Sequence, residues 1–131
     1  MGVRYPTAVS TTLVTANIVT SAETVVVTSP PLTLTLDFSQ VLLWYAVYLG
    51  ANGAGSVNII ATIRRGAAVG GTQVSVQQRS VASPGNVTFI SGVYVDTPGA
   101  VAGQQYSITI TMQAATTNTS VTDVCLLAAA L

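Results

Sequence analysis

The sequence predicts an all-β fold, a two-sheet antiparallel β-sandwich of jelly-roll type with about eight strands. Val and Thr dominate the chain, and these β-branched residues pack well on a pleated sheet but lose rotamer freedom in helices. Several runs alternate apolar and polar residues, which is the pattern of a strand with one buried face, and no stretch has a convincing 3.6-residue period. Turn residues separate these runs at the spacing typical of a sandwich.

The expected strands differ in how their apolar residues are placed. The run 32–38 alternates without a fault, so Leu36 and Phe38 are expected on one buried face with the earlier leucines, and 106–112 alternates in the same way. The run 41–49 is apolar on both faces, which is typical of a central strand or of one covered by a neighbouring subunit. It contains Trp44, which we expect to be buried. The eight strands are expected at residues 23–29, 32–38, 41–49, 56–64, 72–79, 87–95, 104–113 and 119–127.

Turn chemistry supports these boundaries. Residues 83–86 and 97–100 each place Pro at the second turn position, where its fixed φ helps, and Gly at the third, where a type II turn needs positive φ. Residues 51–53 are a hairpin candidate, and Gly70-Gly71 is a second one after Gly66. The Gly-rich segments have no following helix and no phosphate-contacting Lys, so we interpret them as turns rather than as a phosphate site.

The N-terminal segment does not fit the sandwich pattern. Residues 1–22 alternate only weakly, and they are too many for a simple loop and too apolar for a solvated tail. We therefore divide the chain into an N-terminal extended arm, 1–22, and a β-sandwich domain, 23–131. The arm is expected to lie on another molecule, with Arg4, Tyr5 and Leu13 as candidate contacts.

The composition excludes several classes of function. Half of the 131 residues are hydrophobic and only 6% are charged, against about 25% in an ordinary soluble domain. Disorder is excluded, because it requires low hydrophobicity and high charge. The net charge is zero, which argues against nucleic-acid or anionic-membrane partners, since both need a surplus of Lys and Arg.

The sequence shows no pattern of a membrane-spanning segment or of a secretory signal. No apolar run approaches the roughly 20 residues that span a bilayer, and the first 22 residues lack the apolar core of a secretory signal, so we expect an unprocessed N-terminus. Cys125 is the only cysteine, so no internal disulfide is possible. These features fit synthesis in a cytoplasm.

No motif for catalysis is found. The four acids are scattered singly, and the abundant Ser and Thr residues have no His or Lys to activate them. Asp96 precedes a Pro-Gly turn, and we interpret it as a turn-initiating residue. We expect a protein that is not an enzyme, with no catalytic, cofactor-binding or metal-binding residues. The alternative that backbone carbonyls and one Asp bind a calcium ion stays open.

Arg64 and Arg65 are the only adjacent charges, and on a strand they point to opposite faces. They form either a strand-end pair that aids solubility, or a pair in which one guanidinium binds a carboxylate or carbonyl of another subunit. The tyrosines Tyr5, Tyr48, Tyr94 and Tyr106 are further interface candidates, with half of them expected in the core. The chain has no Lys, although charged residues are the usual protection of exposed sheet edges, so edges and apolar outer faces are expected to be covered in a homo-oligomer.

Three stretches carry a resemblance to a known group. Residues 61–66 with 71–74, residues 95–99, and residues 103–110 together look like small β-sandwich virion proteins of tailed bacteriophages, over about residues 55–112. The nearest role in that group is the capsid decoration or cement protein. The resemblance implies a homo-oligomer, typically a trimer, that docks on the major capsid protein at the capsid exterior and stabilises the shell. Arg4, Tyr5, Leu13, Arg64 and Arg65 are then candidate capsid or subunit interface residues.

Other functions stay open beside this one. The main alternative is a tail fibre or spike module that binds a host receptor or glycan, because the resemblance also covers such modules. A genome-enclosing coat protein is disfavoured by the missing basic arm. A carbohydrate-binding module would need exposed aromatic platforms, which a buried Trp44 would not supply.

Overall fold

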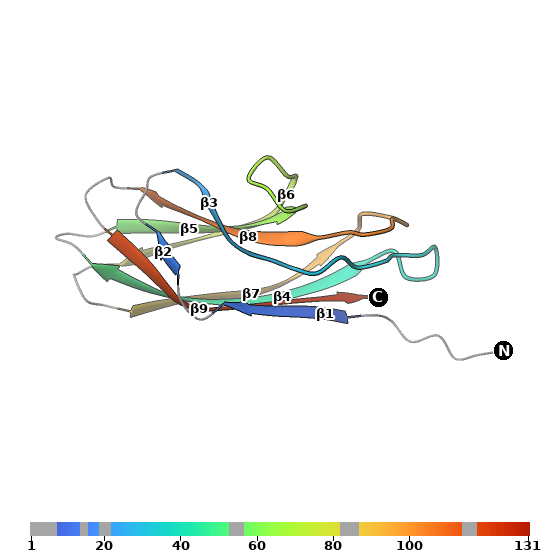
Figure 1. The fold of residues 1–131 in the computed structure, drawn as a ribbon, viewed down its shortest axis with the longest axis horizontal. Coiled ribbons are helices and arrows are strands. Elements are labelled where there is room, and N and C mark those ends of the chain that lie inside the picture. Colours follow the sequence, from blue (N-terminus) through green and yellow to red (C-terminus); the bar gives the residue numbers. More distant parts are fainter. Residues whose placement is uncertain (1–7, 14–15, 19–21, 53–56, 82–86, 114–117) are drawn as a thin grey trace.

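The computed structural model describes residues 8–13, 16–18, 22–52, 57–81, 87–113 and 118–131 (Figure 1). Two antiparallel sheets stack face to face and enclose one core, and the described residues contain no helix. The first sheet has the order β1-β9-β4-β7, with β2 also paired to β9, and the second has the order β3-β8-β5-β6. The strands are β1 Ala8–Leu13, β2 Ala16–Ile18, β3 Thr24–Thr28, β4 Val41–Asn52, β5 Val57–Arg65, β6 Gln73–Val81, β7 Val87–Asp96, β8 Tyr106–Gln113 and β9 Asn118–Ala130.

The strand pairing confirms the predicted sandwich of jelly-roll type. With the short β2 set aside, the first strand pairs with the last, the second with the second to last, and so on inward to β5 and β6. This is one long antiparallel hairpin that has folded over into two sheets. Successive strand pairs of this hairpin lie alternately in the two sheets. Because the first strand pairs with the last, segments distant in sequence become neighbours, such as β1 beside β9.

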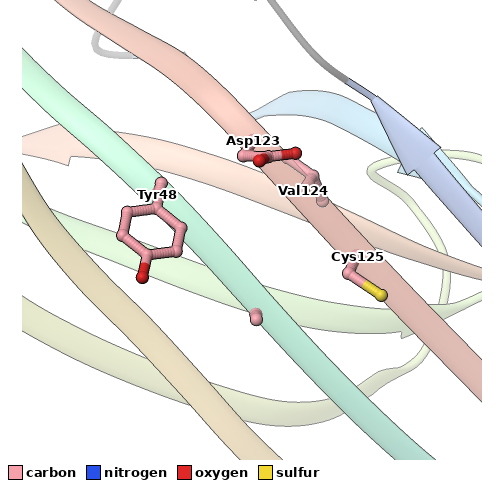
Figure 2. Close-up of a pocket in the computed structure, with 5 residues that line it drawn as sticks. Tyr48, Asp123, Val124 and Cys125 are labelled. Carbon is pink, nitrogen blue, oxygen red and sulfur yellow. The ribbon is translucent and has the colours of Figure 1, made fainter.

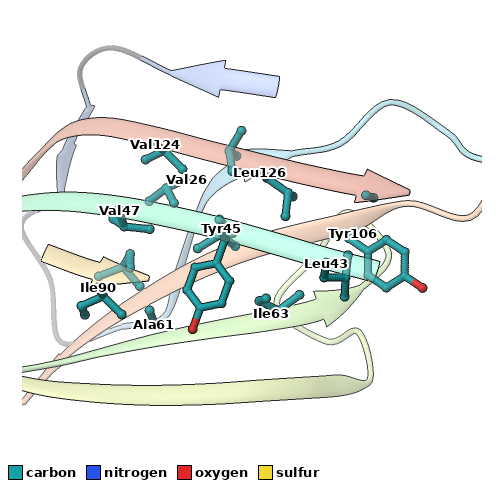
Figure 3. Close-up of a cluster of buried hydrophobic side chains, with 14 of the residues drawn as sticks. Val26, Leu43, Tyr45, Val47, Ala61, Ile63, Ile90, Tyr106, Val124 and Leu126 are labelled. Carbon is teal, nitrogen blue, oxygen red and sulfur yellow. The ribbon is translucent and has the colours of Figure 1, made fainter. Parts of the chain in front are cut away.

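The core follows from the period of two along each strand. In β4 the odd positions, among them Leu43, Tyr45 and Val47, are buried, while the even positions point away from the other sheet. From the facing sheet, Ala61 and Ile63 of β5 join the same core (Figure 3). Ile108 and Ile110 of β8 belong to it as well. The prediction that 41–49 is a central strand is confirmed, since β4 lies between β9 and β7.

One predicted strand is wrong. Residues 32–38 do not form a regular strand: Leu32 and Leu34 are buried and bond to the 101–104 segment, but the chain then turns. The backbones of Thr35 and Phe38 hydrogen-bond to each other across this turn, which leaves Leu36 89% exposed. The alternation correctly predicts that Leu32 and Leu34 are buried. The hydrogen bonds of the turn determine the conformation of the residues that follow.

The turns agree with the sequence where they are described. Gly99 has φ +84°, as expected for the third position of the 97–100 turn, and Gly66 has φ +92° in the connection between β5 and β6. In that connection the backbone N–H of Arg65 donates to the carbonyl of Thr72. The predicted turn at 83–86 and the glycine of the 51–53 hairpin lie outside the described residues.

The N-terminal segment contributes two edge strands. β1 pairs with β9 from Ala8 opposite Ala129 to Leu13 opposite Val124, and β2 pairs with the earlier half of β9. Described parts of residues 1–22 thus lie on the first sheet of their own chain, just before β3 begins. Whether this segment acts as an arm on another molecule stays a prediction.

Candidate functional site

The outer side of the first sheet carries an unusual amount of exposed apolar surface. Trp44 lies in register between Val93 of β7 and Leu127 of β9, and Tyr48 lies beside Phe89. We call this surface the apolar face. Its exposed members are Trp44, Tyr48, Phe89, Val93 and Val95, and its half-buried members are Leu42, Ala46, Cys125, Leu127 and Ala129.

The apolar face arises because β4 is apolar at every position of its first nine residues. Its odd residues fill the core, so its even residues must point outward. The prediction that Trp44 is buried is therefore wrong: its side chain is 40% exposed. An apolar run predicts a central strand, but it does not tell whether the second face meets protein or solvent.

An aromatic pair and a shallow hollow lie at one end of the apolar face. The rings of Tyr48 and Phe89 have centroids 4.8 Å apart and are tilted by 48°. Next to Tyr48 a hollow of about 130 Å³ is lined by Ala46, Val124, Asp123 and the free Cys125 (Figure 2). Asp123 is exposed and is the single charged residue described on this face. The site is therefore suited to apolar contacts with one acceptor at its rim.

The size of the apolar face points to an interaction surface. Its five exposed side chains are each between 40% and 63% accessible, which amounts to roughly 400–500 Å² of mostly apolar area. The largest exposed apolar patch of a soluble protein is about 300–600 Å² and is often its functional surface, which makes this face the candidate interaction site. The face has no set of side chains for acid–base or nucleophilic chemistry among the described residues.

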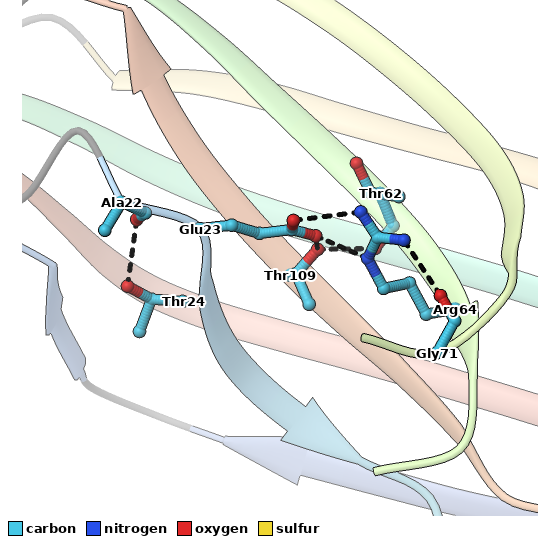
Figure 4. A network of polar contacts seen from close by, with 7 residues as sticks. All are labelled: Ala22, Glu23, Thr24, Thr62, Arg64, Gly71 and Thr109. Carbon is cyan, nitrogen blue, oxygen red and sulfur yellow. Dashed lines mark hydrogen bonds and ion pairs between the residues drawn. The ribbon is translucent and has the colours of Figure 1, made fainter. Parts of the chain in front are cut away.

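The outer side of the second sheet is polar and carries its own ion pair. We call it the polar face; it contains Asn58, Thr62, Gln78, Ser80, Thr109 and Thr111, with Ile60 and Val76 among them. The Nε of Arg64 lies 2.6 Å from Oε1 of Glu23, and its NH2 nitrogen lies 2.9 Å from Oε2 (Figure 4). The NH1 group of Arg64 donates to the carbonyl of Gly71 at 2.9 Å. The hydroxyl of Thr109 also donates to Glu23.

This ion pair joins three strands. Glu23 directly precedes β3, Thr109 lies on β8, and Arg64 is on β5, in the order of the strands in the sheet. The hydrogen bond from Arg64 holds the pKa of Glu23 below its ordinary value, against the opposing effect of burial. The same carboxylate raises the pKa of Arg64. The arrangement satisfies the charged groups within the chain and leaves no unpaired charge for a partner at this point.

Arg65 forms a second pair, which links the two sheets at the end of the sandwich. Its Nε and NH2 lie 2.7 Å and 2.6 Å from the carboxylate oxygens of Asp96, the last residue of β7. The hydroxyl of Tyr106, on β8, donates to the same carboxylate at 2.8 Å. Burial would raise the pKa of Asp96, but the hydrogen bonds from Arg65 and Tyr106 outweigh it and lower this pKa.

The structure revises the interpretation of Asp96. The sequence suggested a turn-initiating residue, and Asp96 does end β7, but its side chain is only 7% exposed and accepts hydrogen bonds from Arg65 and Tyr106. Sequence reasoning missed one signal. Asp96 and Arg65 both lie at strand ends in a chain with few charges, so they are candidates for an ion pair. The two residues meet only because β5 and β7 belong to facing sheets.

The predicted interface residues fall in different places. Arg4 and Tyr5 lie outside the described residues, and Leu13 ends β1 opposite Val124. Arg64 and Arg65 do point to opposite sides of β5, and each binds a carboxylate of its own chain. A contact of these arginines with another subunit stays a prediction. Such a contact would use the parts of the guanidinium groups that remain accessible.

Of the candidate tyrosines that the structure describes, one lies in the core and two are exposed. Tyr106 is fully buried, whereas Tyr48 is 46% exposed and Tyr94 is 41% exposed. Tyr5 is not described. Tyr48, on β4, points to the outer side of the first sheet, whereas Tyr94, on β7, pairs with the buried Leu43 and points to the opposite side of the same sheet.

No group of three or more His, Cys, Asp or Glu side chains is close enough to hold a metal ion in the described ranges. Within the same ranges, no helix is long and apolar enough to cross a membrane.

Known structures share the fold of this chain. A structure of infectious bursal disease virus, Gx strain, has a TM-score of 0.62 at 11% identity and covers 97% of this chain and 32% of that chain. The VP2 subviral particle of the same virus has a TM-score of 0.61 at 13% identity, with 94% of this chain and 32% of that chain covered. The T13 viral particle gives 0.57 at 11% identity, with coverages of 95% and 35%.

No family model and no curated protein matches the sequence. The chain spans about a third of the length of the virus proteins it resembles in structure, as the 32% coverages show. At these identities the likeness shows the fold alone: the chain has the β-sandwich architecture found in these virus particles.

Proposed function

We propose that this protein is a non-enzymatic structural protein of a virion, which assembles with copies of itself and docks on a protein shell. The observation that carries this proposal is the apolar face, where Trp44, Phe89 and Val93 are exposed and Asp123 is the single charged residue among those described. A surface of this kind is stabilised when a partner covers it. The shared fold with virus particles supports the same class of function.

The more specific role is that of a capsid decoration protein. The resemblance stated above implies a trimer that sits on the exterior of the shell and contacts the major capsid protein, after synthesis in the host cytoplasm. Arg4, Tyr5, Leu13, Arg64 and Arg65 are the proposed capsid or subunit contacts outside the apolar face. Many such contacts, repeated over a symmetric lattice, add up to a large stabilisation of the shell.

The test compares particles with and without the protein. Virions are produced from the genome that encodes the chain and from the same genome with this reading frame deleted. Purified wild-type particles are expected to contain the protein, and particles that lack it are expected to lose integrity at a lower temperature, because a ligand that binds only the assembled state stabilises that state. Absence of the protein from purified virions would refute the virion role, and identical heat inactivation would refute the decoration role.

A second function has one specific observation in its favour. The exposed Trp44 and the Tyr48–Phe89 pair lie on one face of β4 and β7, and exposed aromatic rings are the surfaces on which sugar rings stack. The alternative is therefore a tail fibre or spike module that binds a host glycan. Glycan-array binding that is lost in Trp44→Ala and retained in Val76→Ala, a change on the polar face, would favour this alternative over decoration.

A further inference from the structure

We infer that the free edge of β7 pairs antiparallel with β7 of a second copy, so that two first sheets join into one continuous sheet. This inference rests on the proposed function, since it names the contact through which copies assemble. The observations that carry it are the open hydrogen-bonding edge of β7, the protection of the other edges, and the size of the apolar face.

The edge of β7 is long and regular. β7 has ten residues, Val87–Asp96, and pairs with β4 without any register shift. In the described residues no strand pairs with its other side. β6 of the facing sheet lies nearby, and Gln77 approaches Gly92, but no hydrogen bond joins β6 and β7 in these residues. A row of backbone N–H and C=O groups is thus available to another strand.

β7 also lacks the features that normally protect an edge. It contains no Lys, Arg or Pro, and its one acid, Asp96, is turned inward onto Arg65. Exposed Phe89, Val93 and Val95 lie along it. An edge that is flat, apolar and uncharged is a template for pairing with another chain.

The other edges are shorter, irregular or polar. β3 has five residues and a register shift between Val25 and Val27. β6 carries Arg79 and several glutamines, and its pairing with β5 is shifted at Ile63. The edge opposite β7 is divided between β1, with six residues, and β2, with three. These are the devices by which edges avoid pairing.

These differences select a second copy of β7 as the occupant. In two identical molecules, β7 is the edge that is open on each, and antiparallel pairing of a strand with itself gives an isologous two-fold contact. The contact brings no unpaired charges together, because Asp96 is neutralised by Arg65 within each copy.

The apolar face is also smaller than a stable interface requires. The exposed side chains of the apolar face supply roughly 400–500 Å², whereas a stable interface buries about 800 Å² on each partner. A contact through the face alone is therefore too small. Backbone pairing along β7 adds directional hydrogen bonds, and it places the apolar faces of two copies side by side as one larger surface.

The first experiment uses two matched Val→Lys changes on edge strands. Val93 is 63% exposed on β7, and Val76 is 43% exposed on β6. The mass of the wild type and of both variants is measured by light scattering over a concentration series. Val93→Lys is expected to weaken association at least tenfold, while Val76→Lys associates like the wild type. Equal association of all three proteins would overturn the inference.

The second experiment reads the edge itself by amide hydrogen exchange. In antiparallel pairing with β4, alternate β7 amides point away from β4 and exchange rapidly in a monomer. On association, these amides are expected to become protected, while the corresponding β6 amides stay unprotected. An oligomer whose outward β7 amides still exchange rapidly would overturn the inference and leave the proposed function standing. A chain that stays monomeric yet decorates shells would likewise overturn the inference and leave the proposed function standing. A monomer that is absent from virions would refute both proposals.

Discussion

The two outer faces of the sandwich have the same strand geometry but differ in how their side chains are satisfied. On the polar face, Arg64 binds Glu23 and Gly71, and Thr109 donates to the same carboxylate, so these three side chains find partners within the chain. On the apolar face, Trp44 and Val93 remain exposed with no covering element among the described residues. The ion pair of the polar face is therefore satisfied within one molecule, whereas the apolar face is exposed in one molecule, and we propose that a partner covers it.

This difference shows how a chain with 6% charged residues distributes its few charges. The scarce charges are used for internal bonds, at Glu23–Arg64 and Arg65–Asp96, rather than for solubility over the whole surface. Changes on the apolar face should act on association, and changes at the ion pairs should act on folding.

Truncation of Trp44 should weaken assembly far more than it weakens folding. Trp44→Ala removes the largest exposed side chain of the apolar face, and a buried interface Trp typically contributes about 2 kcal/mol or more to binding, or about 30-fold in affinity. We expect a corresponding loss in copies per virion, counted by quantitative mass spectrometry. The matched control is Val76→Ala on the polar face, which should leave copy number unchanged. Equal losses in both variants would show that the two faces do not differ in function.

Acid should destabilise the monomer through the two ion pairs. The pKa values of Glu23 and Asp96 are lowered in the fold, so their contribution to stability is fully present above their unfolded values near about 4 and is lost as pH falls through the lowered values. Urea unfolding should give a constant free energy between about pH 7 and 5 and a decrease below about pH 4. In Glu23→Gln the decrease should be smaller, because one of the two titrating groups is gone. An unchanged decrease would assign the acid effect to other groups.

Loss of the Glu23 charge should cost about 1 kcal/mol of unfolding free energy at neutral pH, because the pair is partly exposed and Arg64 keeps its bond to Gly71. Association should not change, since Glu23 lies on the polar face. Chemical denaturation gives the first quantity and light scattering the second. The exposed Asp123→Asn on the apolar face is the control for folding, with an expected change within about 0.5 kcal/mol.

The smallest expected effect is at Ser107, on the polar face beside Arg64. Its side chain is fully buried, and its hydroxyl has no hydrogen-bond partner among the described residues. Ser107→Ala removes an unsatisfied polar group, so the free energy of unfolding should stay the same or rise by up to about 1 kcal/mol. A loss above about 1 kcal/mol would mean that this hydroxyl has a partner in solution.

Sequence reasoning found most of the fold because alternation and turn chemistry act over a few residues. The runs that became β4, β5 and β8 were located to within a few positions, and Gly99 has the positive φ that its turn requires. It failed at 32–38, where Leu36 follows the same alternation but lies in a turn. Alternation reports which side chains share a face; it does not report whether the backbone finds a paired strand.

The candidate site was harder to predict. The run 41–49 was identified as apolar on both faces, yet Trp44 was expected inside, because a sequence does not reveal which of two apolar faces receives the second sheet. Arg64 and Arg65 were correctly placed on opposite sides of their strand, but their partners Glu23 and Asp96 are 41 and 31 residues away. Such pairs depend on which strands become neighbours.

The sequence by itself determined the all-β class, the central apolar strand, the turns and the shortage of charge, because each of these follows from residue type and short-range spacing. The tertiary structure alone decided which acids bind Arg64 and Arg65, that Trp44 faces outward, and that β7 ends the first sheet with an open edge. The reason is physical: strand order is a long-range property, and it is set by how the hairpin folds over into two sheets.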